Sequence, residues 1–311
     1  MKIVFLDAAT MGDTSLEEIA ALGELKAYPT STPEEAEARV AEADVLIVNK
    51  MKVTDALMDK APGLRLICEA ATGVNNIDLA AAERRGILVR NVAGYSSDSV
   101  AQLTWTQILS LTSGARYFDA RVKDGTYSRS GIFTDLTRNW NELAGKTLGV
   151  IGLGTIGTRV ARIGEAFGMK VVYFSTSGTS HSREYPSLPL DELLAVSDIV
   201  TIHAPLNERT SGLLGEKELA MMKPSAYLIN AGRGGIVSET ALAAAVDSGV
   251  IAGAALDVFE REPLPGDSPL LAVSHPERFR FTPHTAWASV EARGRLAAAI
   301  AANIRNYINQ S

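Results

Sequence analysis

The sequence of 311 residues has a single cysteine, Cys68, and no long apolar run. One cysteine excludes an intrachain disulfide and a zinc site built from several thiolates. Because Leu66 and Ile67 precede it, we expect Cys68 to be a buried and unreactive thiol. No segment approaches the ~18 consecutive apolar residues that a membrane-spanning helix requires. The apolar run at residues 3–6 is too short for a signal peptide, so we expect a cytoplasmic protein.

An excess of basic residues is also lacking. Lys and Arg number 30 against 36 Asp and Glu, which gives a formal net charge of −6, and no basic cluster interrupts that balance. We therefore expect neither nucleic acid nor a membrane as a partner. Only four histidines occur, and two of them, His181 and His275, lie in polar turns without a motif. No histidine or carboxylate pair has the spacing of metal ligands, so no metal site is predicted.

The chain does contain enough apolar residues, 46% of the total, to fill the cores of two domains. In the first hundred residues, short apolar runs alternate with segments of helical spacing, which indicates βαβ units and a parallel sheet. We predict strands at residues 3–6, 25–28, 45–48, 66–68 and 87–90, and helices at residues 17–22, 33–42, 55–60 and 79–85.

A second series of the same kind follows a turn-rich stretch at residues 91–98, where Ser97 or Asp98 can cap a helix that opens at Ser99. Six strands with intervening helices then make a doubly wound domain. The predicted fold is α/β, with two parallel-sheet Rossmann-like domains and a cleft between them, the larger domain binding a dinucleotide. We place the six strands at residues 147–151, 170–174, 199–203, 226–230, 253–257 and 279–282.

The first strand of the second series ends in a glycine-rich turn that opens a helix, Gly152-Leu153-Gly154-Thr155-Ile156-Gly157. In a dinucleotide-binding turn, the first glycine permits the sharp bend and the second lets a pyrophosphate approach the backbone. The third lets the helix pack closely on the strand. The amides at the start of the helix, including those of Thr155 and Ile156, would bind the phosphates. A merely flexible turn is the rival interpretation.

The strand at residues 170–174 ends without the acidic residue that usually binds the adenosine ribose of NAD. Ser175, Thr176 and Ser177 stand there instead. An acid would repel the 2′-phosphate of NADP, whereas hydroxyls do not. Arg183 is the nearest cation in the sequence, but six or more loop residues separate it from the strand. We therefore predict NAD or NADP as the cofactor and leave the choice open.

Three downstream motifs supply an arginine, a glutamate and a histidine. Arg233 stands between glycines after a strand, Glu262 follows the next strand, and His284 follows Pro283 at the end of the last. To reduce a 2-keto acid, a protein needs a cation that holds the carboxylate and polarises the carbonyl. It also needs an acid that protonates the new alkoxide. An arginine fork matches a carboxylate, and a carboxylate beside a histidine favours its protonated form.

These motifs, in this order behind this turn, resemble the D-isomer-specific 2-hydroxyacid dehydrogenase family over most of the chain. The resemblance implies that Arg233, Glu262 and His284 are the catalytic residues. It also implies that the carboxylate paired with His284 is that of Glu262, while Glu260 is a solvated loop charge.

Further contacts with the cofactor are implied by the same resemblance. Asp257 would face the nicotinamide carboxamide, and Ala231 would lie against the cofactor together with the loop His203-Ala204-Pro205. For His203 a simple end of the strand explains the sequence equally well.

The family also implies how the domains are organised. The last helix, in which Leu296, Ile300 and Ile304 recur every fourth residue, would return to the first domain. The predicted domains are then residues 1–98 with 287–311, which bind the substrate, and residues 99–286, which bind the dinucleotide.

The substrate side is predicted from a loop in the first domain. In the family, backbone amides of the loop that is here Thr72-Gly73-Val74 bind the substrate carboxylate. A turn rich in asparagine, with Asp78 capping the next helix, explains the same residues. Lys50 or Tyr95 could contact a polar substituent of the substrate.

Residues 49–50, 91–96 and 284–289 are similar to the glycerate dehydrogenase (hydroxypyruvate reductase) branch. We therefore expect a homodimeric, NAD(P)-dependent reductase of hydroxypyruvate or glyoxylate. The alternatives are a dehydrogenase of D-lactate or D-3-phosphoglycerate, and a dinucleotide-sensing corepressor on the same fold.

Overall fold

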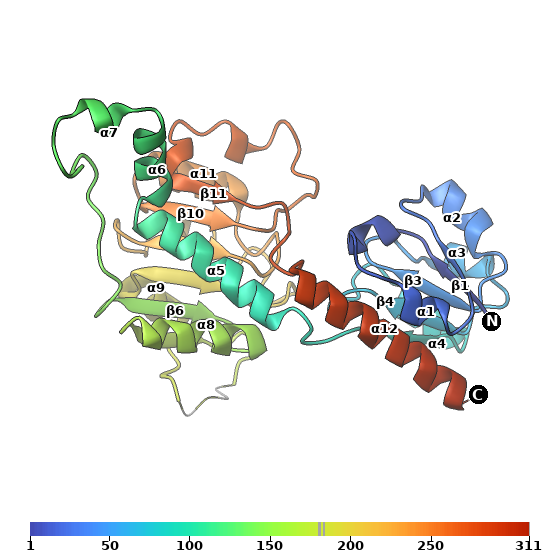
Figure 1. Ribbon diagram of the computed structural model, residues 1–311. Helices are drawn as coiled ribbons and strands as arrows, with labels where there is room; N and C mark the ends of the chain where they lie inside the picture. The colour runs from blue at the N-terminus through green and yellow to red at the C-terminus, as the bar shows by residue number, and fades with distance from the viewer. Residues whose placement is uncertain (180–181, 183, 311) are drawn as a thin grey trace. The chain divides into compact units, whose positions relative to one another are not determined.

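The computed structural model describes residues 1–179, 182 and 184–310, so Arg183 and His181 lie outside the described residues. The chain divides into two compact units, the first made of Met1–Ser96 with Ala288–Ser311 and the second of Ser97–Trp287. Each unit is built on its own parallel sheet (Figure 1). Within the described residues no helix has the length and apolar character to cross a membrane.

The sheet of the first unit has five parallel strands in the order β2-β1-β3-β4-β5. Strands β3 and β4 are fully buried, as the apolar runs Val45–Val48 and Leu66–Cys68 predict. The strands are β1 (Lys2–Phe5), β2 (Glu24–Ala27), β3 (Val45–Val48), β4 (Leu66–Glu69) and β5 (Leu88–Arg90).

Short capped helices connect these strands. Thr32 and Glu35 form a capping box at the start of α2, while Thr54 and Asp78 cap the starts of α3 and α4. The last helix, α12, packs against α1 and β4 of this unit through its stripe of apolar residues. The helices are α1 (Glu17–Ala20), α2 (Pro33–Val40), α3 (Asp55–Asp59), α4 (Leu79–Arg84) and α12 (Val290–Gln310), with a 3-10 turn at Ala8–Met11.

The sheet of the second unit has six parallel strands in the order β11-β10-β9-β8-β6-β7. The order reverses between β6 and β8, which is where sheets of this kind bind ligands at their carboxyl edge. The strands are β6 (Thr147–Ile151), β7 (Lys170–Phe174), β8 (Ile199–Ile202), β9 (Tyr227–Asn230), β10 (Gly253–Leu256) and β11 (Phe279–Phe281).

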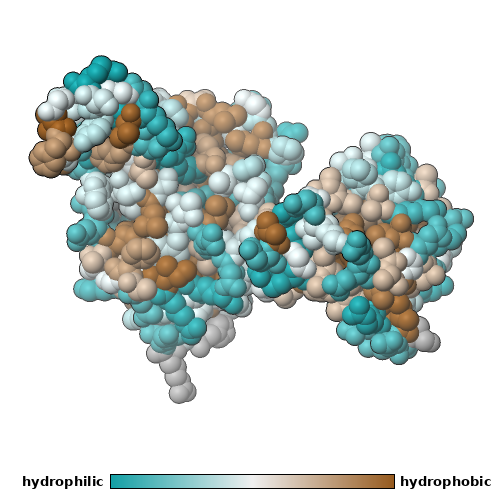
Figure 2. All heavy atoms as spheres, viewed as in Figure 1, coloured by the Kyte–Doolittle hydropathy of each residue, from teal (hydrophilic) through white to brown (hydrophobic). Residues whose placement is uncertain are grey.

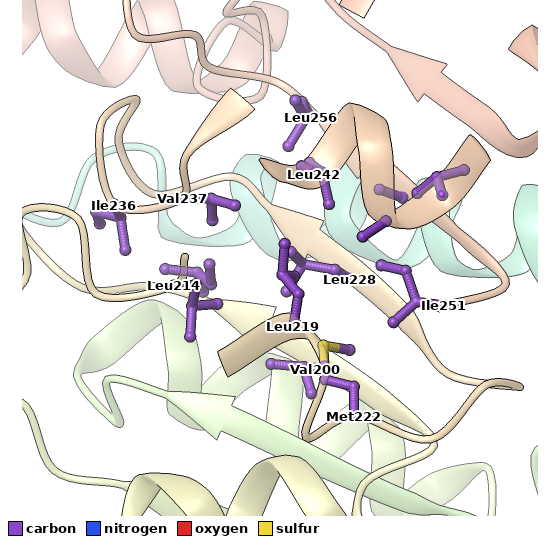
Figure 3. Packing of buried hydrophobic residues seen from close by; sticks show 14 of the residues in the cluster. Val200, Leu214, Leu219, Met222, Leu228, Ile236, Val237, Leu242, Ile251 and Leu256 are labelled. Carbon is purple, nitrogen blue, oxygen red and sulfur yellow. The ribbon is translucent and has the colours of Figure 1, made fainter. Parts of the chain in front are cut away.

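Helices cover both faces of this sheet. On one face α5 packs against α8 and the strands β9, β10 and β11 (Figure 1). On the other face α9, α10 and α11 enclose the large core of Figure 3, in which Leu219, Leu228 and Leu242 are fully buried. The helices are α5 (Ser97–Thr112), α6 (Ala115–Lys123), α7 (Thr126–Arg129), α8 (Thr155–Ala166), α9 (Leu190–Val196), α10 (Glu216–Leu219) and α11 (Glu239–Asp247), with 3-10 turns at Pro269–Leu271 and Pro276–Arg278.

The structure corrects the predicted start of one helix. Helix α5 begins at Ser97, two residues before the predicted opening at Ser99. Both residues taken as candidate caps therefore belong to the first turn of the helix. The sequence contains no separate signal for α6 and α7, which lie between α5 and β6. Neither helix has a buried residue. Without a buried face, a short helix leaves little periodic signal.

Candidate functional site

The glycine-rich turn links β6 to α8 in the geometry of a dinucleotide site. Gly152 has φ +90, and a Cβ there would lie 3.0 Å from the backbone of His203 and Ala204. A Cβ on Gly157 would lie 2.2 Å from the carbonyl oxygen of Gly152, so only glycine allows the helix to pack this closely. Gly154 is the N-cap of α8 and has nothing within 4 Å of its Cβ position. The open space above Gly154 leaves the amides at the helix start accessible to a pyrophosphate.

The first residues of α8 are Thr155 and Ile156, so the structure places both predicted phosphate-binding residues at the helix N-terminus. The loop that follows β8 lies beside this turn. It contains Ala204, which is buried, and Pro205, whose carbonyl oxygen accepts a 2.6 Å hydrogen bond from the Thr210 hydroxyl.

His203 directly follows β8, and its ring is a neutral group. Its Nε2 lies 2.9 Å from the Thr201 hydroxyl, and burial lowers its pKa to about 3. Its Nδ1 is buried without a hydrogen-bond partner among the described residues. A buried polar atom without a partner is unusual, and the predicted contact of His203 with the cofactor remains a prediction.

The end of β7 carries a cluster of hydroxyl groups. The Ser175 hydroxyl donates to the carbonyl oxygen of Thr179 and lies 3.1 Å from the Ser177 hydroxyl. Thr176, between them, is partly exposed. A cation that the sequence does not indicate also lies here: Arg209, from the loop after β8, donates from Nη1 to the Ser177 carbonyl oxygen at 2.6 Å. The two residues are 32 positions apart in the sequence, and no local pattern signals this contact.

Arg233 follows β9 and is held by its own loop. The Asn230 side chain accepts from the Gly232 amide and donates to the Arg233 carbonyl oxygen, which fixes the turn from both sides. A Cβ on Gly234 would lie 1.8 Å from the Phe259 carbonyl oxygen, so this turn requires glycine. The guanidinium donates to the Gly232 carbonyl oxygen at 2.8 Å, and no carboxylate of the described chain forms an ion pair with it. An arginine without an acidic partner is available to a carboxylate ligand.

Neighbouring Ala231 is buried against Val100 and Ala286. The predicted cofactor contact of Ala231 would therefore have to use its backbone.

Asp257 holds the turn that carries His284. Its Oδ1 accepts from the Thr282 hydroxyl at 2.6 Å and from the Thr285 amide at 2.9 Å, and its Oδ2 accepts from the Ala286 amide at 3.0 Å. The His284 amide donates to the Asp257 carbonyl oxygen at 2.7 Å. Because this carboxylate is buried and hydrogen-bonded within the protein, Asp257 acts as a positioning residue for the turn. The predicted contact with the nicotinamide remains a prediction.

His284 and Glu262 form the central pair of the site. Nδ1 of His284 lies 2.7 Å from Oε2 of Glu262, and the side chains are 21% and 31% exposed. The Phe259 amide donates to Oε1 of Glu262 at 3.1 Å and so fixes the carboxylate. Since an ionised carboxylate only accepts hydrogen bonds, Nδ1 carries the proton in this bond. Nε2 is then free to exchange a proton with a ligand.

Glu260, by contrast, is not simply a solvated loop charge. Its Oε1 accepts from the Glu239 amide at the start of α11, and its own amide donates to the Glu239 carboxylate. This reciprocal pair ties the loop after β10 to α11. Glu260 is exposed, as predicted, but it also holds this loop in place and makes no contact with His284 in the described structure.

The predicted substrate residues lie in the first unit. The loop at residues 72–74, with Gly73 and Val74 partly exposed, follows β4 and is fixed by the Thr72 hydroxyl, which donates to the Val92 carbonyl oxygen at 3.0 Å. Lys50 follows β3, with its amide bonded to Asp7 and its side chain exposed. Tyr95 is buried, which makes it less suited than Lys50 to contact a ligand.

Beneath this loop lies an acid that the sequence analysis did not single out. Glu69, the last residue of β4, is 0% exposed, and its Oε2 accepts from the Asn76 side chain at 2.9 Å. Burial, and to a lesser degree the charge of Asp7, raises the pKa of Glu69 to about 8. In sequence it looks like part of an apolar strand followed by a turn, which is why no pattern marked it.

No group of three or more histidine, cysteine or acidic side chains among residues 1–179, 182 and 184–310 could hold a metal ion.

Comparison with known proteins adds to this geometry. The sequence profile described as "D-isomer specific 2-hydroxyacid dehydrogenase, NAD binding domain" matches residues 105–286. A putative 2-hydroxyacid dehydrogenase of Haemophilus influenzae is 38% identical over 100% of this chain and 99% of its own length. Glycerate dehydrogenase of Methylorubrum extorquens is 35% identical over 99% of this chain and 96% of its own. The crystal structure of D-lactate dehydrogenase from Aquifex aeolicus with NAD and lactic acid has a TM-score of 0.86, with 30% identity over 99% and 96% of the two chains.

Proposed function

Since the chain belongs to the D-isomer-specific 2-hydroxyacid dehydrogenase family, we propose that it interconverts a small 2-keto acid and its D-2-hydroxy acid through Arg233, Glu262 and His284. The observation that carries these roles is the 2.7 Å bond between His284 and Glu262. It stands at the carboxyl edge of the sheet that also presents Arg233 and the glycine-rich turn. The residues at this edge fit an NAD(P) cofactor, because the turn leaves open space above Gly154.

When bound, the reduced nicotinamide supplies a hydride to the carbonyl carbon. The guanidinium of Arg233 binds the substrate carboxylate and polarises the carbonyl, as its planar fork suits it to do. His284 gives the proton on Nε2 to the carbonyl oxygen, which becomes the hydroxyl of the product. Glu262 stabilises the positive imidazolium before transfer and holds the ring in orientation. In the reverse direction neutral His284 takes the proton.

The substrate contacts on the first unit belong to the same proposal. Backbone amides of Thr72, Gly73 and Val74 bind the carboxylate, and Lys50 contacts a polar substituent. The exposed side chain of Lys50 and the partly exposed backbone of the loop support this assignment. We assign the substrate-binding domain to this unit and the dinucleotide-binding domain to the second, with boundaries near residues 98 and 287.

Hydroxypyruvate or glyoxylate is the proposed substrate. The whole-length similarity to a glycerate dehydrogenase and the sequence of residues 91–96 support it. D-lactate and D-3-phosphoglycerate are the alternatives. Initial rates with hydroxypyruvate, glyoxylate, pyruvate and 3-phosphohydroxypyruvate, each with NADH and with NADPH, decide among them. A higher kcat/KM for pyruvate than for hydroxypyruvate would overturn the substrate assignment, and no turnover with any of the four would overturn the proposed activity.

The proposal includes a homodimer in the cytoplasm. In the cytoplasm the enzyme would have access to the nicotinamide nucleotide that it requires. The dimer is supported by a group of exposed apolar side chains in the second unit, which we call the apolar arm. Figure 2 shows hydrophobic residues gathered at the surface around α6 and α7. The arm consists of Val122, Ile132, Phe133, Leu136 and Trp140, of which Phe133 is 90% exposed. Apolar side chains gathered in this way mark an interface, and we assign it to a second copy of the chain.

A further inference from the structure

The end of β7 is the place in a dinucleotide domain where the adenosine ribose is recognised. In this chain the strand ends in Phe174, and the next three residues all carry hydroxyl groups. An aspartate or glutamate here would bind the two free ribose hydroxyls of NAD and would repel a 2′-phosphate. Hydroxyl groups can donate hydrogen bonds to phosphate oxygens. The local sequence therefore admits a phosphate but does not supply a charge to hold it.

The loop after β8 supplies that charge. Arg209 reaches the turn after β7, where its Nη1 donates to the Ser177 carbonyl oxygen at 2.6 Å and lies 3.1 Å from the Cβ position of Gly178. The Asn207 side chain accepts from the Arg209 amide at 2.9 Å, which fixes the backbone from which the arginine projects. Gly178 has φ +83, so the turn bends under the guanidinium.

The Arg209 guanidinium carries a charge that is available to a ligand. No carboxylate of the described residues lies within ion-pair distance of its guanidinium, although neighbouring Glu208 is exposed in the same loop. Only Nη1 has a hydrogen-bond partner there, a carbonyl oxygen, which leaves the donors on Nη2 and Nε available. Two of the nearby hydroxyls, those of Ser175 and Ser177, lie 3.1 Å apart on the same turn. The guanidinium is the charged donor that a phosphate monoester would meet on this turn, and the Ser175 hydroxyl, which here donates to the Thr179 carbonyl oxygen, would have to turn toward the phosphate to donate to it.

We propose that Arg209, together with Ser175 and Ser177, forms a binding site for the 2′-phosphate of NADP(H), so that this enzyme prefers NADP(H) to NAD(H). The inference rests on the proposed dinucleotide site and goes beyond it by choosing between the two cofactors. Arg209, the residue that would make this choice, lies in the loop after β8 and is 32 positions from Ser177 in the sequence. A cofactor fingerprint read from the end of β7 alone does not include it. A rival explanation is that Arg209 only braces the turn at Ser177, in which case its loss would affect both cofactors equally.

Binding of nucleotide fragments tests the proposal without any turnover. Calorimetric titration of the full-length protein with 2′,5′-ADP and with 5′-AMP compares ligands that share the adenosine 5′-phosphate and differ in the 2′-phosphate. We expect 2′,5′-ADP to bind at least tenfold more tightly than 5′-AMP. Arg209→Met should weaken 2′,5′-ADP by about 10- to 100-fold, the value of a charge-assisted hydrogen bond, and should change 5′-AMP by less than about threefold. Arg209→Lys should retain part of the preference, because it keeps the charge but loses the fork.

Two further variants sharpen the comparison. Arg65→Met is the matched control, since Arg65 is also an exposed arginine that donates to backbone carbonyl oxygens, in this case those of Pro62 and Leu64. It should leave both titrations unchanged. Ser175→Asp should abolish the preference for 2′,5′-ADP by placing a carboxylate beside the phosphate.

Steady-state kcat/KM with NADPH and NADH should follow the same pattern. Equal binding of the two fragments by the wild type, or equal losses for both in Arg209→Met, would overturn the assignment while leaving the dinucleotide site in place. Failure of both fragments to bind the wild type would overturn this assignment and the proposed cofactor site together.

Discussion

At the scale of single residues, the site depends on hydrogen bonds that fix each side chain in one role. His284 is held from three directions, by the Glu262 carboxylate, by the Asp257 carbonyl oxygen and by the turn that the Asp257 side chain stabilises. Its φ of 52 is unusual for a residue other than glycine, so the surrounding bonds must keep the backbone there. Such an arrangement suits a group that must deliver a proton to one atom.

His284→Ala removes the proposed acid. We expect kcat for keto-acid reduction to fall by about 10²-fold or more, the usual contribution of general acid catalysis, while the Kd of the nucleotide changes little. Stopped-flow reduction and nucleotide titration measure the two quantities. His275→Ala, which alters a histidine in a polar turn, is the control and should change neither kcat nor the Kd of the nucleotide. Near wild-type turnover by His284→Ala would show that another group protonates the product.

Glu69 predicts a pH dependence of stability. Its pKa is raised from 4.5 to about 8 in the folded chain, so between these values the folded state holds a proton that the unfolded state has lost. Stability should therefore fall as the pH rises from about 4.5 to about 8, at most by about 1.4 kcal/mol per pH unit.

Glu69→Gln removes the titrating group but keeps an amide that can bond to Asn76. Its free energy of unfolding relative to wild type should therefore rise steadily over this pH range and level off above it. Urea unfolding of both proteins at pH 5, 6, 7 and 8 measures the difference. Parallel pH profiles would mean that Glu69 is ionised throughout.

At the scale of elements, the turn between β6 and α8 uses two glycines for two different reasons. Gly157 allows close packing, since its Cβ position lies 2.2 Å from a carbonyl oxygen, whereas Gly154 faces open space. A methyl group added at Gly157 would therefore disturb the packing of the helix, whereas one added at Gly154 would affect only the space for a ligand.

Gly157→Ala should lower both the melting temperature and the affinity for the nucleotide, because overpacking costs about 1–3 kcal/mol and shifts the helix. Gly154→Ala should lower only the affinity, since its φ of −83 suits any residue and the added methyl projects toward the phosphates. Differential scanning fluorimetry and nucleotide titration of the two variants give the comparison. A stability loss in Gly154→Ala equal to that in Gly157→Ala would contradict the distinction.

At the scale of the whole molecule, the apolar arm predicts self-association. We expect the wild type to sediment as a dimer and the double variant Phe133→Ser with Leu136→Ser to sediment as a monomer, because those two side chains are 90% and 79% exposed in the single chain. Leu271→Ser is the control, since Leu271 is an exposed apolar residue outside the arm and its loss should leave the dimer intact. A monomeric wild type, or a dimeric double variant, would refute this role of the arm.

The sequence by itself determined the strands of both sheets and indicated the residues of the candidate site. The strands could be predicted because apolar runs such as Val45–Val48 are fully buried, and burial on both faces leaves an unmistakable pattern. The glycine-rich turn could be predicted because backbone conformation and close approach allow only glycine at Gly152 and Gly157. The triplet of Arg233, Glu262 and His284 could be named because each stands in a distinctive motif in the loop after a strand, and because those motifs resemble the family.

Only the tertiary structure decided which of these groups meet. The sequence places Glu260 and Glu262 two residues apart, yet one is bonded to α11 and the other to His284, because the loop after β10 turns between them. Arg209 could not be associated with Ser177, nor Asn76 with Glu69, since such contacts depend on how separate loops approach and on no local pattern. The proton affinity of Glu69 was likewise decided by burial, which is a property of the folded chain. Local interactions can be predicted from sequence patterns, because the residues involved are neighbours in the chain. Desolvation and contacts between distant loops arise only when the chain has folded.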